Sequence, residues 1–119
     1  MLHSALLGLI QGSCESVLIL VEQLPRDELI RSRLTRAEVQ RQLATLAASV
    51  AQIEPEQRAT MPEFDWSGWA LMGMQLARPP GETLDEALWF ASQSLVPATL
   101  LWLRVYRQSQ PDLFRMSVA

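Results

Sequence analysis

The chain has 119 residues, of which 49% are hydrophobic and 19% are charged, and its formal net charge is −3. This length predicts one compact domain over residues 1–119, and the apolar content excludes a disordered chain. Because it contains one cysteine, Cys14, and one histidine, His3, an internal disulfide and a Cys/His zinc site are excluded. We therefore expect neither a metal nor a cofactor. The acidic balance argues against a general nucleic-acid coat protein.

Residues 1–24 predict an amphipathic helix that ends at Pro25. Its apolar residues alternate at spacings of three and four, which keeps them on one helix face. We expect no membrane span, because Gln11, Glu15 and Glu22 interrupt the stretch, and no export signal, because a basic start and a cleavage site are missing. The expected location is cytoplasmic. The predicted core residues are Leu7, Ile10, Cys14, Val17, Val21 and Leu24.

Residues 26–34 predict a short connector helix, and a longer helix follows it as far as Pro55. In the sequence Thr35-Arg36-Ala37-Glu38, the Thr35 hydroxyl and the Glu38 carboxylate have the spacing of a capping box, which predicts that the long helix begins at Thr35. The apolar spacing of four and three indicates one buried face along this helix. That face contains Val39, Leu43, Leu46, Val50 and Ile53.

Residues 54–65 predict a loop with at most one helical turn, and Asp65 is a good N-cap for a third helix over residues 66–77. That helix contains no charge between Asp65 and Arg78. A helix that is apolar nearly all round must be covered on both sides, and one small bundle can cover only one of them. Residues 79–81, Pro-Pro-Gly, must break the helix.

The last helix is predicted to begin at a second capping box, from Thr83 to Glu86, and to end at Pro111. We expect Pro97 to bend it without changing the register of its buried stripe, and residues after about 109 to fray. The stripe contains Leu84, Leu88, Ala91, Leu95, Ala98, Trp102 and Val105. Together, the four main helices and the connector predict an all-α fold, an antiparallel four-helix up-and-down bundle.

Four passages of the sequence stand out together: residues 35–43, 61–66, 84–89 and 95–97. The first has the pattern Thr-Arg-x-x-Val-x-Arg-x-Leu at the start of a helix, and the second ends in tryptophan before the third helix. The third is the apolar opening of the last helix, and the fourth is a Leu-x-Pro within that helix. In this order they resemble the HepT-like branch of the HEPN superfamily, small helical-bundle proteins often paired with a minimal nucleotidyltransferase, in which the second passage precedes the catalytic helix.

Ribonucleases of this superfamily carry Arg-x(4–6)-His, in which the histidine acts as acid or base and the arginine holds phosphate. Counting from Trp66, the expected arginine falls on Gly73 and the expected histidine on Arg78. The family's Gly-Glu in the second long helix becomes Ala47-Ala48. The resemblance therefore predicts no catalytic residue, and a HepT-like protein that acts by protein–protein interaction instead of as an enzyme.

The resemblance also implies that two protomers join through the third helix. We therefore predict a homodimer, together with a possible nucleotidyltransferase-type protein partner. The predicted interface residues are Trp66, Trp69, Met72, Gly73 and Leu76.

Three arginines are candidates for a phosphate or partner contact: Arg36, Arg41 and Arg78. The competing interpretation is structural, with Arg36 and Arg41 in side-chain pairs and Arg78 as a cation at a helix C-terminus. Two other functions remain open. One is a toxin-like, metal-independent ribonuclease that acts on RNA through a displaced site containing these arginines. The other is a small-ligand or nucleotide-binding module with a pocket lined by the tryptophans.

Overall fold

The fold is all-helical, as the sequence predicts, over residues 2–115, which a computed structural model describes and in which no strand occurs. These residues form one body with principal extents of 47 × 26 × 23 Å. The helices are α1 (Leu2–Val21), α2 (Arg26–Arg31), α3 (Arg33–Ala51), α4 (Pro55–Ala59), α5 (Trp66–Leu76), α6 (Glu82–Phe90), a π-helical turn η1 (Ala91–Leu95), α7 (Val96–Ser109) and a 3₁₀ turn η2 (Pro111–Phe114).

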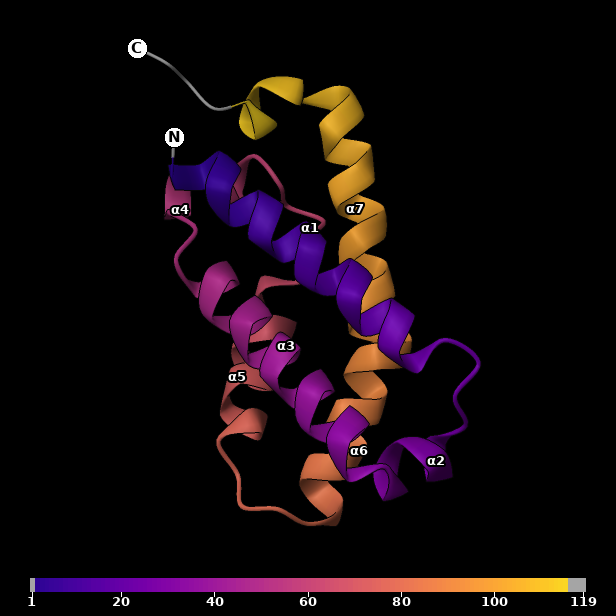
Figure 1. The fold of residues 1–119 in the computed structure, drawn as a ribbon. Helices are drawn as coiled ribbons and strands as arrows, with labels where there is room; N and C mark the ends of the chain where they lie inside the picture. Colours follow the sequence, from indigo (N-terminus) through magenta and orange to yellow (C-terminus); the bar gives the residue numbers. More distant parts are fainter. Residues whose placement is uncertain (1, 116–119) are drawn as a thin grey trace.

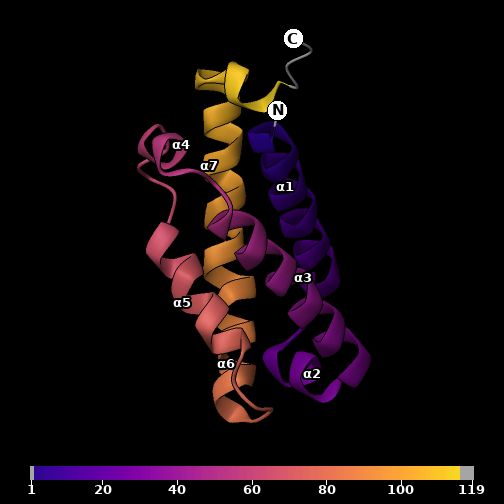
Figure 2. The same ribbon diagram turned by 90° about the vertical axis from the view of Figure 1, so that its left-hand side faces the viewer.

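The long helices pack side by side around one core. Helix α1 lies against α3 and α7, and α3 also contacts α5 (Figures 1 and 2). The connector α2 sits at the end of the molecule where α3 begins, and α6 with η1 leads into α7 (Figure 1). The predicted buried stripes of the first two long helices are confirmed, except that Leu24 is only partly buried.

The helix starts agree only in part with the predicted caps. Asp65 caps α5 as predicted, because its carboxylate accepts the Gly68 N–H at 2.9 Å. The capping box at Thr35 is wrong: α3 begins two residues earlier, and its cap is Ser32, whose hydroxyl oxygen accepts the Thr35 N–H at 3.4 Å. Ser32 already supplies the acceptor that the first turn needs, so Thr35 is left inside the helix.

The second predicted capping box, at Thr83, is also wrong. Helix α6 begins at Glu82, and its N-cap is Gly81, with no side-chain cap. The acidic residues Glu82 and Asp85 lie in the first turn, where negative charge interacts favourably with the helix dipole.

The predicted register of the last helix is correct up to Leu95 and wrong beyond it. Leu84, Leu88, Ala91 and Leu95 are buried, but Ala98 and Val105 are exposed and Trp102 is only partly buried. The turn η1 is the cause, because a π-helical turn contains one residue more than an α-helical turn. Each buried position therefore moves one residue along the chain, to Thr99, Leu103 and Tyr106.

The C-terminal segment is more ordered than the expected fraying after about residue 109. The turn η2 packs against α1 and α7. Leu113 and Phe114 are partly buried against the core, and the Arg107 guanidinium lies 4.4 Å from the centre of the Phe114 ring. The rest of that predicted frayed tail, residues 116–119, lies outside the described residues.

Helix α1 is apolar enough to raise the question of a membrane. Residues His3–Val21 have the length and composition of a membrane-crossing helix, with a mean hydropathy of 1.7. The same residues supply a continuous stripe of the core, including Ile10, Cys14 and Val17, which are fully buried. Core packing thus accounts for much of the hydropathy of this helix.

Candidate functional site

Helix α5 is held by its N-terminal turn. The Asp65 carboxylate accepts hydrogen bonds from the Gly68 N–H at 2.9 Å and from the Ser67 hydroxyl at 3.4 Å. A Cβ atom added to Gly68 would collide with this carboxylate, so a larger residue at position 68 would require the Asp65 side chain to move. The cap fixes where α5 starts and therefore which residues face α3 and α6.

One face of α5 belongs to the core of the chain itself. Trp69 and Met72 are only 1% and 4% exposed. The Trp69 indole N–H donates to the Thr99 hydroxyl at 2.9 Å, and that hydroxyl donates to the Leu95 carbonyl at 2.7 Å. Trp69 and Met72, two of the predicted interface residues, are therefore already packed within a single chain, against η1 and α7.

Trp66, another predicted interface residue, ties the start of α5 to α4 and to the loop between them. Its indole N–H donates to the Met61 carbonyl at 3.1 Å, its ring stacks on Phe64 at 4.4 Å, and the Arg58 guanidinium lies 5.1 Å from the ring centre. Burial raises the pKa of the nearby Tyr106 to about 12, and its hydrogen bond to the Glu63 carboxylate acts in the same direction. These contacts serve the fold.

A shallow groove of about 320 Å³ lies between α3 and α5, and its walls are small residues. Gly73 and Leu76, the remaining predicted interface residues, line it. A Cβ atom on Gly73 would lie 3.8 Å from the Ala47 Cβ, so the two helices approach closely here. We call this surface the alanine face; its residues are Ala44, Ala47, Ala48, Ala51, Trp69, Ala70, Gly73 and Leu76.

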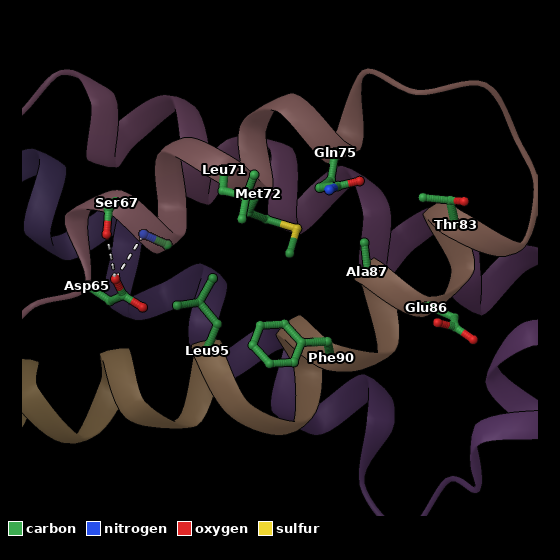
Figure 3. A pocket seen from close by; sticks show the side chains of 11 residues that line it. Asp65, Ser67, Leu71, Met72, Gln75, Thr83, Glu86, Ala87, Phe90 and Leu95 are labelled. Carbon is green, nitrogen blue, oxygen red and sulfur yellow. Dashed lines mark hydrogen bonds between the residues drawn. The ribbon is translucent and has the colours of Figure 1, made fainter.

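A second groove, of about 590 Å³, runs between α5 and the α6–η1 segment (Figure 3). Its middle is apolar, with Leu71 and Met72 on one wall and Phe90 and Leu95 on the other. Figure 3 shows a carboxylate at each end, Asp65 at one and Glu86 at the other. We call it the acid-ended groove, and its lining contains no basic residue.

The three candidate arginines do not share a site. The Arg36 guanidinium donates to the Ile30 carbonyl at the end of α2, and Arg41 forms an ion pair with Glu38 on the same helix. That pair lowers the pKa of the Glu38 carboxyl, chiefly through the hydrogen bond from Arg41. Arg36 lines a small cavity with Pro80 and Gly81, which neither Arg41 nor Arg78 lines. Arg36 and Arg41 thus each have a structural partner within the chain, a backbone carbonyl for Arg36 and a carboxylate for Arg41.

The other chemistry-bearing residues are also dispersed. His3 is at the start of α1, and the start of α1 and the end of α5 lie at opposite ends of the molecule (Figure 1). Cys14 is buried in the core as predicted, and burial raises the pKa of its thiol to about 12. Residues 2–115 contain no group of three or more His, Cys, Asp or Glu side chains able to hold a metal ion.

The tryptophans are likewise divided among different surroundings. Trp69 lies at the alanine face, Trp89 lines a cavity with Arg26, and Trp102 stacks on Tyr106 at 5.8 Å.

Comparison with protein-family models, with curated proteins and with solved structures finds no match to this chain. The function must therefore be argued from the two grooves beside α5.

Sequence reasoning missed most residues of both surfaces. A signal for the alanine face is present in the sequence, because Ala44, Ala48 and Ala51 recur at helical spacing opposite the buried stripe. The acid-ended groove had no such signal, because its two walls are separated by the break at residues 79–81 and only the fold brings them together.

Proposed function

We propose that this chain is a non-catalytic, HepT-like interaction protein that forms a homodimer through the alanine face. The fold class that accompanies this proposal is an up-and-down four-helix bundle of α1, α3, α5 and the α6–η1–α7 segment. The contacts of α1 with α3 and α7, and of α3 with α5, support this arrangement.

The alanine face carries the proposal. Ala44, Ala48 and Ala70 are exposed on two adjacent helices, and none of the residues that line this groove is charged or polar. An exposed, charge-free apolar surface is typical of an interface. Because its side chains are small, two copies could bring their helix backbones close together, and no like charges would oppose the contact. Here Gly73 and Leu76 keep their proposed interface role, and the alanines replace Trp69 and Met72.

The same surface supports the resemblance to HepT-like proteins. Gly73 stands where the family's catalytic arginine is expected, and Ala47-Ala48 where its Gly-Glu is expected. These positions are far apart in sequence and adjacent in the fold. Small apolar residues at both positions provide neither a phosphate ligand nor an acid or base. As the resemblance implies, we also propose a nucleotidyltransferase-type protein as a second partner.

Light scattering after size-exclusion chromatography tests the dimer. We expect the wild-type mass to be that of two 13.4 kDa chains. Ala48→Glu/Ala70→Glu should give a single chain with an unchanged circular dichroism spectrum, because both residues are exposed and buried like charges would oppose association. Ala98→Glu is the matched control, an exposed alanine on α7, and should remain dimeric.

Two results would contradict the proposal. A wild-type protein that is monomeric at about 100 μM would refute the proposed dimer, since stable homodimers associate at concentrations well below that. Cleavage of RNA by the purified protein in EDTA, abolished by Arg78→Ala, would show an active ribonuclease and restore the displaced-site alternative.

A further inference from the structure

We propose that the acid-ended groove binds one amphipathic α-helix of a different protein, with an apolar face and a basic residue near each end. This inference does not depend on the proposed homodimer, because the groove and the alanine face are lined by different residues of α5.

The shape of the groove indicates a helix as its occupant. One wall follows α5 through Gly68, Leu71 and Gln75, at spacings of three and four residues. The other follows α6 through Thr83, Glu86 and Phe90 at spacings of three and four. Two helices whose faces border an apolar trough over about two turns are the usual receptor for a third helix, which inserts side chains spaced by three and four residues.

The groove has apolar area that the chain itself leaves uncovered. Leu71 and Phe90, on opposite walls, are each 56% exposed. Figure 3 shows the Phe90 ring and the Met72 and Leu95 side chains around the same central space. Aromatic and aliphatic side chains in such a position contribute strongly to binding once a partner removes them from water.

The charges select the partner. Asp65 and Glu86 lie at opposite ends of the groove, and no cation lines it. One basic residue beside it is Arg26, whose guanidinium contacts one Glu86 oxygen at 3.3 Å on the exposed surface. A second copy of this chain, groove against groove, would add two more carboxylates and no cation to the contact. A helix with arginine or lysine at both ends instead complements it.

Two synthetic helical peptides of about 14 residues test the proposal, since that length gives about four turns. Both carry leucine at three- and four-residue spacings on one face; one has arginines at both ends and the other has glutamates. We measure their binding to the full chain by fluorescence anisotropy. The arginine peptide should bind roughly fivefold or more tightly than the glutamate peptide, because two exposed ion pairs distinguish them. This preference should decrease with added salt.

Variants assign the binding to the groove. Phe90→Ser should weaken the binding of the arginine peptide about tenfold or more, because it removes a central apolar contact. Leu101→Ser, at a leucine that is 59% exposed on α7, is the matched control and should change binding less than twofold. Asp65→Asn/Glu86→Gln should abolish the preference between the peptides while keeping the α5 cap, since asparagine caps as well as aspartate.

The following results would overturn the proposal. They are equal binding of both peptides, equal loss in Phe90→Ser and Leu101→Ser, or no binding at about 1 mM peptide, an affinity too weak for a specific helix site. Conversion of a wild-type dimer to a monomer by Phe90→Ser would assign the groove to a second copy instead. The dimer variant Ala48→Glu/Ala70→Glu should still bind the arginine peptide, so the two proposals fail separately.

Discussion

The hydrogen bond from Trp69 to Thr99 gives a sharp test of the core around α5. Thr99→Val keeps the shape of the side chain but removes the hydroxyl oxygen that accepts the Trp69 indole N–H at 2.9 Å. Both side chains are almost fully buried, at 1% and 3% exposure, so water cannot replace the lost acceptor. The variant therefore leaves a donor unsatisfied in the core.

The expected cost is about 1–3 kcal/mol in the free energy of unfolding, the range for a buried polar group without a partner. For 119 residues, the unfolding entropy per residue converts each 1 kcal/mol into roughly 4 °C of melting temperature. We therefore expect Thr99→Val to lower the melting temperature by roughly 4–12 °C. Trp69→Phe removes the donor, so adding Thr99→Val to that variant should cost much less than it costs alone.

Thermal and urea unfolding, followed by circular dichroism, measure these differences. Thr45→Val is the matched control, because the Thr45 hydroxyl also donates to a carbonyl four residues earlier, that of Arg41 at 3.2 Å, but accepts nothing from an indole. It should change stability by less than about 0.5 kcal/mol. Equal effects of Thr99→Val and Thr45→Val, or an undiminished effect of Thr99→Val in the Trp69→Phe chain, would refute the reasoning.

Three further predictions test other parts of the fold. Asp65→Ala should cost about 1 kcal/mol by unfolding in urea, because the Gly68 N–H loses its cap, whereas Asp65→Asn should be nearly neutral. The pKa of the Cys14 thiol is raised by burial from 9.0 to about 12. The folded chain keeps this thiol neutral, so its contribution to stability is complete below pH 9 and is lost as the pH rises toward 12; at pH 10 the loss is about 1.4 kcal/mol. Cys14→Ala should remove that part of the alkaline decline, and an unchanged decline would contradict it. Tyr106→Phe should cost about 1 kcal/mol in the same assay, because the Glu63 N–H loses the phenol oxygen that it contacts at 3.0 Å.

Local patterns predicted the helices well where one chemical signal had no competitor. Asp65 stands alone before an uncharged run, and it caps α5 as expected. Before α3, Ser32 and Thr35 are both able to cap, and sequence alone does not decide between them. The structure selects Ser32, and the Glu38 that would complete the box at Thr35 pairs with Arg41 instead. Choosing between two capable residues requires the packing of the preceding turn.

The register of α7 could not be predicted from periodicity, because a regular apolar spacing gives no sign of the extra residue in the π-helical turn. Pro97 has no N–H, and its ring would clash with the carbonyl four residues earlier, that of Gln93, in a regular α-helix. Residue 93 lies inside the turn η1, where the wider π-helical turn relieves this crowding. Pro97 thus predicted an irregularity, but not its form. The shift brings Thr99 under Trp69, and the core hydrogen bond exists because of it.

The residues of the candidate site could be predicted only in outline for a related reason. The uncharged sequence of α5 predicts cover on more than one side, but not which residues the chain covers itself. Trp69 and Met72 are the large apolar residues that a hydrophobic pattern identifies most readily, and both are buried in the core of the chain itself. What remains outside is smaller or less regular: alanines towards α3, and Leu71 with Phe90 towards α6.

Helix α5 therefore lies between two uncovered apolar surfaces that differ in charge, and this difference argues for two different partners. The alanine face is uncharged, so identical copies can meet there without repulsion. The acid-ended groove carries Asp65 and Glu86, and a second copy placed groove against groove would add two more carboxylates and no cation. If both surfaces are interfaces, a homodimer of this chain holds two grooves free for two basic helices. A complex with two partner helices per dimer, and one per chain in Ala48→Glu/Ala70→Glu, follows from this arrangement and is measurable by light scattering.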